Sequence, residues 1–129
     1  MRVRTSSRGF TLIELLVVMA IVALLVSIAA PRYFHSVEKS KETALRTSLA
    51  TMRDAIDQFH ADKSRYPESL DELASARYLR EIPEEPISGS RAHWLTLPPP
   101  SDSQEKGAVY DVKSSTPGRA SDGRLYSDW

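Results

Sequence analysis

Residues 10–30 form an apolar run in which Glu14 is the only charged side chain. As an α-helix this run would be about 31 Å long, because a helix rises about 1.5 Å per residue. That length matches the hydrocarbon core of a bilayer, which is about 30 Å thick. Arg2, Arg4 and Arg8 precede the run and as many basic residues follow it closely, so charge does not set its orientation. We therefore expect one membrane-spanning helix near the N-terminus.

The remainder of the sequence is typical of a small polar domain. The chain has 129 residues with 17 basic and 17 acidic side chains, a length that allows one modest domain. It contains no cysteine, which excludes a disulfide framework, a cysteine zinc site and a thiol nucleophile. Without Arg2, Arg4 and Arg8, acids outnumber basic residues by three. This balance argues against nucleic-acid binding, which favours a basic surface.

Two other interpretations of the apolar run remain open. The run could be a secretory signal peptide, with Ser27 and Ala29 in a small-x-small cleavage site, and the exported domain would then be soluble. Alternatively, it could be an uncleaved signal anchor. In that case Thr11 and Glu14 would form a capping box, which explains the acid locally without any partner.

The carboxylate of Glu14 raises the free energy of membrane insertion if the apolar run lies in a bilayer. An acid well inside hydrocarbon costs roughly 2.5 to 3.5 kcal/mol on insertion scales, so it calls for a partner. A cut after Gly9 would create a free α-amino group on Phe10, and a neighbouring copy shifted along the helix axis could bring that amine to Glu14. Breaking such a buried ion pair would cost several kcal/mol.

The sequence Arg-Gly-Phe-Thr-Leu-Ile-Glu-Leu-Leu at 8–16, between a short basic leader and Pro31, resembles the type III signal of type IV pilins and type II secretion pseudopilins. The resemblance implies that a prepilin peptidase cuts between Gly9 and Phe10 and methylates the new amine. It also implies that Glu14 pairs with this amine during assembly. The predicted parts are a cleaved leader at 1–9, a transmembrane and assembly helix at 10–30, and a periplasmic globular domain at 31–129.

The same resemblance implies a structural role rather than an enzymatic one. The chain would be a single-pass protein of the bacterial inner membrane that polymerises into a periplasmic, helical homopolymer supporting protein secretion. Its implied partners are further copies of itself, the prepilin peptidase, the membrane, an inner-membrane assembly platform and minor pseudopilins, with no nucleic acid. A major or minor pilin of a type IV pilus is the alternative, beside the exported soluble protein.

Downstream of Pro31 the pattern predicts an amphipathic helix to about His60. Apolar residues recur at spacings of four and three, which places them on one face of a helix. We call this set the apolar stripe: Leu45, Leu49, Met52, Ile56 and Phe59. The stripe would pack on the chain's own domain, with a separate coiled-coil partner as the alternative. Pro31 would bend or loosen the helix where it lies.

The C-terminal half predicts short elements between turns. Ser69 and Glu72 suggest a capping box that opens a short helix to about Tyr78. Strands are expected at 92–97, at 108–112 and, more weakly, at 125–129. The fold class is therefore α+β: a long N-terminal helix packed on a small C-terminal antiparallel sheet, in a pilin-like arrangement.

This half also resembles the major, G-type pseudopilin of type II secretion, through the motifs at 64–67, 78–83, 110–112 and 122–129. Many major pseudopilins bind calcium in the C-terminal loop, where Ser121, Asp122 and Asp128 offer oxygens here. Calcium takes about six to eight oxygen ligands, yet residues 113–124 contain a single acid. We therefore assign no metal ligands and no cofactor, and interpret the loop as a turn.

The sequence gives little support for catalysis. His35, His60 and His93 are widely separated, and neither a phosphate-binding glycine loop nor a zinc-protease motif is present. The acidic residues of 71–85 lie near prolines, and we expect them to be solvated. No catalytic residue is assigned.

Overall fold

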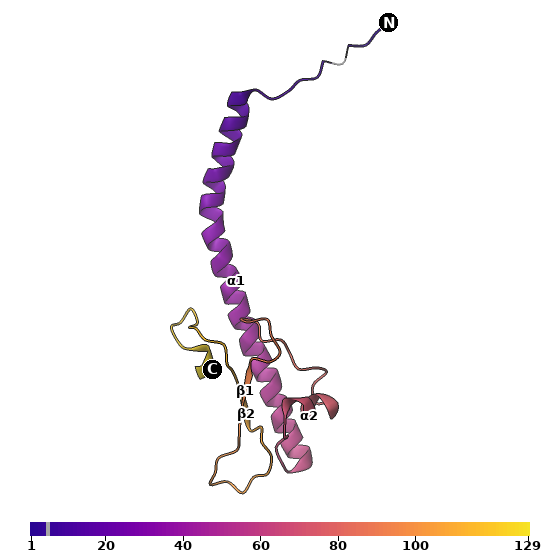
Figure 1. The fold of residues 1–129 in the computed structure, drawn as a ribbon, viewed down its shortest axis with the longest axis vertical. Helices are drawn as coiled ribbons and strands as arrows, with labels where there is room; N and C mark the ends of the chain where they lie inside the picture. The colour runs from indigo at the N-terminus through magenta and orange to yellow at the C-terminus, as the bar shows by residue number, and fades with distance from the viewer. Residues whose placement is uncertain (5) are drawn as a thin grey trace. The chain divides into compact units, whose positions relative to one another are not determined.

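The computed structural model describes residues 1–4 and 6–129. A long helix, α1 (Leu12–Lys63), is followed by the short helix α2 (Leu70–Ser75), the strands β1 (Trp94–Leu97) and β2 (Asp111–Ser114), and the 3₁₀-helix η1 (Tyr126–Asp128) (Figure 1). Contacts divide the chain into two units, Met1–Val37 and Glu38–Trp129. The division falls inside α1, which remains α-helical through Pro31.

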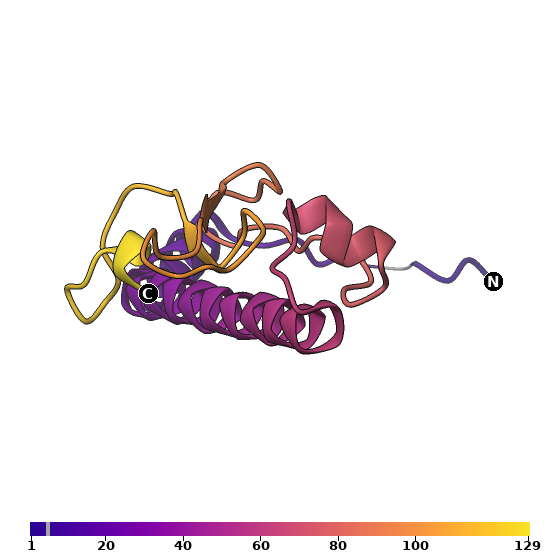
Figure 2. The same ribbon diagram turned by 90° about the horizontal axis from the view of Figure 1, so that it is seen from below.

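The second unit is built on the C-terminal part of α1. Every residue of the apolar stripe is buried, with an exposed fraction of at most 2%. The segments that follow α1 gather along one side of this part of the helix (Figure 2). The prediction that the stripe packs on its own domain is therefore confirmed. Its core is completed by Ala55 of α1 and by residues from α2, both strands and the connecting loops: Leu70, Leu73, Leu79, Trp94, Val109 and Val112.

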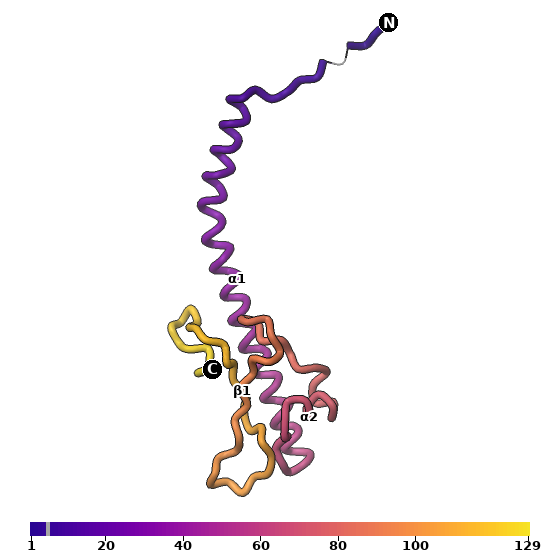
Figure 3. The backbone as a smooth tube through the Cα atoms, in the orientation of Figure 1, coloured from indigo at the N-terminus to yellow at the C-terminus, as the bar shows by residue number. Residues whose placement is uncertain are grey.

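The sheet consists of β1 and β2, paired antiparallel with Trp94 opposite Ser114 and Leu97 opposite Asp111. Trp94, Val112 and Ser114 are buried, whereas Leu95 between them is exposed. Two strands alone are marginally stable in water and need a cover for one face. The stripe of α1 supplies it, so the α+β class is confirmed. Figure 3 traces the loop that joins the two strands.

Three sequence predictions need correction. The third strand at 125–129 is wrong, because the backbone forms i→i+3 bonds such as Asp128 N–H to Leu125 O (3.0 Å) and folds as η1. The second strand lies later than expected, at Asp111–Ser114. Ser69 is confirmed as the N-cap, since its Oγ accepts from the Glu72 amide, while the Glu72 carboxylate accepts from the Glu68 amide (2.7 Å). However, α2 ends at Ser75, before Arg77 takes a left-handed conformation (φ 64°).

The acidic residues of 71–85 were expected to be solvated. For Glu85 this expectation is wrong, because its side chain is fully buried. Its carboxylate accepts hydrogen bonds from the Ser88 amide (2.7 Å), the Ile87 amide (3.3 Å) and the Thr116 hydroxyl (2.7 Å). Burial alone would raise the pKa of Glu85, but these hydrogen bonds outweigh it and hold the pKa below its usual value. Glu85 thereby ties the turn at 85–90 to the segment after β2.

The first prediction concerns the stripe. We expect residues 31–129 alone to fold as a soluble monomer, because the described core lies wholly after Pro31. In this shortened chain, Ile56→Ala should lower the free energy of unfolding by roughly 2 to 5 kcal/mol through lost burial and a cavity. Leu49→Ala should behave alike. Asp57→Ala, on the exposed face, should change it by less than about 0.5 kcal/mol. Denaturant melts that give equally small losses at all three positions would contradict the packing described here.

The second prediction concerns pH. Because the folded-state pKa of Glu85 lies below the unfolded value of about 4.3, its contribution is present above that value and is lost as pH falls through the folded pKa. Glu85→Gln should lower the free energy of unfolding by about 1 to 3 kcal/mol at neutral pH. The variant should also lose less of its remaining stability than the unmodified protein as the pH falls. The neighbouring Glu84, which is exposed, supplies the control variant Glu84→Gln. Identical acid melts of the two variants would refute this role.

Candidate processing and assembly site

The predicted cleavage position lies just before the start of α1. Gly9 and Phe10 are exposed, and they precede the first helical residue, Leu12, by three and two residues. A Cβ added to Gly9 would meet no described atom within 4 Å. The peptide bond between Gly9 and Phe10 is therefore open to an enzyme, and the chain itself leaves room there for a larger side chain.

Glu14 lies in the first turn of α1 and caps it together with Thr11. The Glu14 amide donates to Thr11 Oγ1 (3.2 Å), and the Thr11 amide donates to Glu14 Oε2 (3.4 Å). This is the reciprocal capping box that the sequence allowed. A carboxylate also suits this end of the helix, because the backbone amides give it partial positive charge. Glu14 nevertheless remains exposed, so its carboxylate is accessible to another group.

The structure brings together the three residues singled out by the sequence. Arg8, Gly9, Phe10 and Glu14 line one hollow of about 470 Å³. The carboxylate and the bond whose cleavage would create an amine thus lie around the same space.

The surface of α1 that follows is strongly apolar and uncovered. Leu12, Ile13, Leu16 and Phe10 each expose more than 60% of their surface, and large apolar side chains continue exposed to Ile28. Within residues 1–4 and 6–129, α1 is the one helix long and apolar enough to cross a membrane. So large an apolar surface marks a membrane or protein contact.

Elsewhere the polar residues serve local structure. His60 Nε2 lies 3.0 Å from Glu105 Oε2, and its ring stacks on Tyr66 at 4.2 Å. His35 lies 25 residues earlier on the same helix, and His93 directly precedes β1. In the part of the chain that the structure describes, no three His, Cys, Asp or Glu side chains come together as a metal would require.

The C-terminal loop does not fit a calcium ion. Asp122 Oδ2 lies 2.8 Å from Arg124 Nη2 and 3.4 Å from Arg46 Nη2, so guanidinium groups face the one acid of this loop. Both oxygens of Glu42 are hydrogen-bonded to Ser121. Asp128, the third candidate ligand, is part of η1. The carboxylates of Glu42 and Asp122 thus already accept from donors of the chain itself.

Sequence reasoning missed two residues of α1 that hold the C-terminal segments. Arg53, which lies off the apolar stripe, donates to Asp111 Oδ1 (2.8 Å), Val112 O (3.0 Å) and Trp129 O (2.6 Å). Glu42 is buried and receives the bonds from Ser121. Glu42 lies three residues before Leu45, on the same helix face, and this spacing was the available signal.

Comparison with known proteins agrees with this geometry. Residues 4–30 match the family described as "Prokaryotic N-terminal methylation motif". This match covers Arg4 and Arg8, the hollow at the start of α1, and the apolar surface as far as Ala30. The N-terminal segment is thus of the prepilin class.

Relatives extend the likeness beyond this segment. The chain is 32% identical over 95 residues to "Type II secretion system core protein G" of Klebsiella pneumoniae, covering 61% of this chain and 68% of that protein. The protein of the same name from Dickeya chrysanthemi is 29% identical over 112 residues, covering 87% and 70%. The chain therefore belongs to the family of the type II secretion core protein G.

A type IV pilin is also similar to this chain. "Type IV major pilin protein PilA" of Myxococcus xanthus is 36% identical over 75 residues, which are 58% of this chain but 34% of that protein. The match thus spans about a third of the pilin's length. No solved structure matches the chain.

Proposed function

We propose that this protein is a structural subunit of a type II secretion pseudopilus, not an enzyme. The observation that carries the proposal is the start of α1, where Glu14 and the Gly9–Phe10 bond line one hollow at the head of an uncovered apolar helix. Membership of the core protein G family supports it. The second unit, with its own core, would be the part presented to the periplasm.

In this proposal, a prepilin peptidase removes residues 1–9 and methylates the amine of Phe10. Residues 10–30 anchor the mature chain in the inner membrane and then pack against other copies as the filament grows. The amine of one copy pairs with Glu14 of its neighbour, so that a buried carboxylate gains a counter-charge. The assembly platform and minor pseudopilins are its further expected partners.

A subunit of a type IV pilus is the second candidate. The likeness to the Myxococcus pilin favours it, because the matched residues are 36% identical, against 32% and 29% for the two core G proteins. The longer matches to the core G proteins favour the secretion pseudopilus. Deleting the gene distinguishes the two: loss of secretion indicates the first, and loss of surface pili indicates the second.

The third prediction tests processing. Gly9→Leu should leave the full-length chain in the membrane, because the bulky side chain would no longer fit the peptidase. Gly9→Ala, still small, should be processed. The chain itself has room for either side chain, so a difference reports on the enzyme rather than on folding. Gel mobility of the membrane-bound protein measures the outcome. Processing of Gly9→Leu at the rate of the unmodified protein would show that the cleavage site is wrongly assigned.

The fourth prediction separates the ion pair from the capping box. Glu14→Gln keeps a side-chain acceptor for the Thr11 amide, since Gln also serves in a capping box, but it removes the charge that an amine needs. Thr11→Ala does the reverse: it removes the hydroxyl that accepts from the Glu14 amide. We expect Glu14→Gln to reduce the sedimentable filament at least about tenfold, because the amine would be left without its counter-charge. Thr11→Ala should reduce it much less.

Both variants should still insert into the membrane. If Thr11→Ala is the more damaging change and Glu14→Gln assembles normally, Glu14 acts as a helix cap and the ion pair must be abandoned. Membrane fractionation before filament isolation is the control for expression and insertion.

A further inference from the structure

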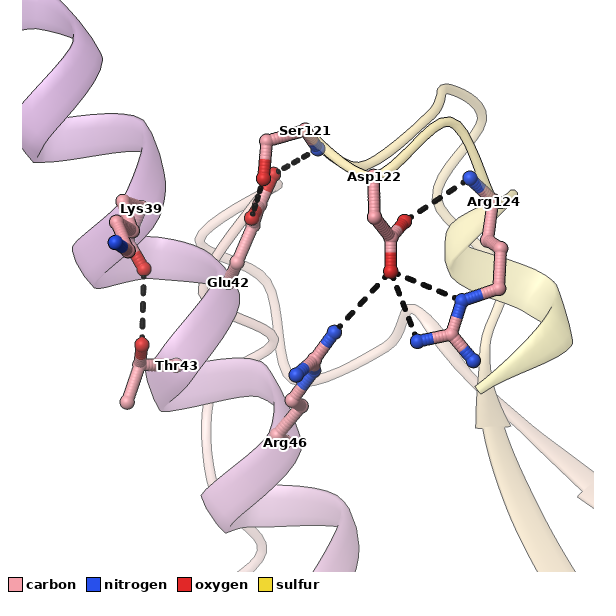
Figure 4. A network of polar contacts seen from close by, with 7 residues as sticks. All are labelled: Lys39, Glu42, Thr43, Arg46, Ser121, Asp122 and Arg124. Carbon is pink, nitrogen blue, oxygen red and sulfur yellow. Dashed lines mark hydrogen bonds and ion pairs between the residues drawn. The ribbon is translucent and has the colours of Figure 1, made fainter.

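Glu42 holds the C-terminal loop against α1. Its Oε1 accepts from the Ser121 amide at 2.6 Å, and its Oε2 accepts from the Ser121 hydroxyl at 2.7 Å (Figure 4). Only 8% of the Glu42 surface is exposed. Hydrogen bonds to a charged and poorly hydrated acceptor are among the stronger ones in proteins. This pair therefore fixes the loop at one residue.

Asp122 adds a second contact between the loop and α1. Its Oδ2 accepts from Arg124 Nε (2.9 Å) and Arg46 Nη2 (3.4 Å), while Oδ1 accepts from the Arg124 amide (3.0 Å) (Figure 4). These hydrogen bonds, with the charges of Arg124 and Arg46, outweigh burial and hold the pKa of Asp122 below its usual value. Arg46 also lies 4.3 Å from the ring centre of Trp129. Each of these ion pairs is exposed and individually weak.

Three backbone oxygens of the loop accept hydrogen bonds from within it. Arg124 O accepts from the Ala120 amide (2.8 Å), and Ala120 O accepts from the Gly123 amide (3.0 Å). Gly123 O accepts from Arg119 Nη1 (2.8 Å). Carbonyl and carboxylate oxygens are the ligands that calcium takes. In this loop, these three carbonyl oxygens and the Asp122 carboxylate accept from amide and guanidinium donors instead.

We propose that the loop at 119–124 is fastened to α1 by Glu42 and Asp122 without a divalent cation, and that Arg46 and Arg124 supply the positive charge. Positive charge at the place where a cation would sit also repels calcium. The structure of the second unit is then independent of calcium. This inference concerns folding alone, so its test does not depend on filament formation or on the proposed function.

Amide hydrogen exchange tests it directly, because the Ser121 amide is itself a donor to Glu42. The full chain in detergent micelles would be compared with millimolar calcium chloride and with a chelator. We expect the exchange rate of the loop amides to be the same in both. Glu42→Ala should speed this exchange roughly tenfold or more, since opening of a local contact sets the rate. Glu38→Ala, the same change at an exposed residue one turn earlier, should leave it unchanged.

Exchange of the core amides around Phe59 reports whether Glu42→Ala still folds. If it does not, Glu42→Gln, which keeps the side-chain size and one acceptor, should give a smaller acceleration confined to the loop. Slower loop exchange in calcium, or faster exchange in chelator, would overturn the proposal. So would unchanged loop exchange in both Glu42 variants.

Discussion

Burial of the apolar stripe of α1 is the interaction on which the rest of the second unit depends. The two-stranded sheet, α2 and η1 are each too short to persist alone. All of them pack on or near the apolar stripe of this helix, whose side chains are almost completely shielded from solvent. Polar contacts from the same helix then fix the chain's later segments: Arg53 holds β2, and Glu42 holds the C-terminal loop.

The earlier part of α1 has the opposite character. From Leu12 to Ile28 it is apolar and exposed, so its partner must come from outside the described chain. A membrane before assembly and other copies afterwards would both cover it, which is how one helix could serve as anchor and as filament contact. Glu14 then has two uses that do not conflict: a helix cap in the single chain, and a counter-charge for an amine in the polymer.

Helical features were the most predictable from the sequence, since spacings of three and four residues identify a buried face directly. The apolar stripe, the N-cap at Ser69 and the α+β class are all found in the structure. The third strand was not predictable in this way, because a five-residue segment can form a strand or a 3₁₀ turn with similar local preference. Glu85 and Arg53 were missed because their partners, such as Thr116 and Val112, are distant in sequence. At the N-terminus, the motif predicted the residues, and the structure added that they share one hollow.

The central claim is that the chain is matured at the start of α1. Intact-mass measurement of the protein extracted from membranes tests it most directly. Our account predicts a mature chain that begins at Phe10, lacks residues 1–9 and carries one methyl group on its new amine. An unprocessed chain of 129 residues, or one that begins near Ala30, would contradict it. The unprocessed chain would indicate a plain signal anchor, and a chain that begins near Ala30 would indicate a conventional exported domain.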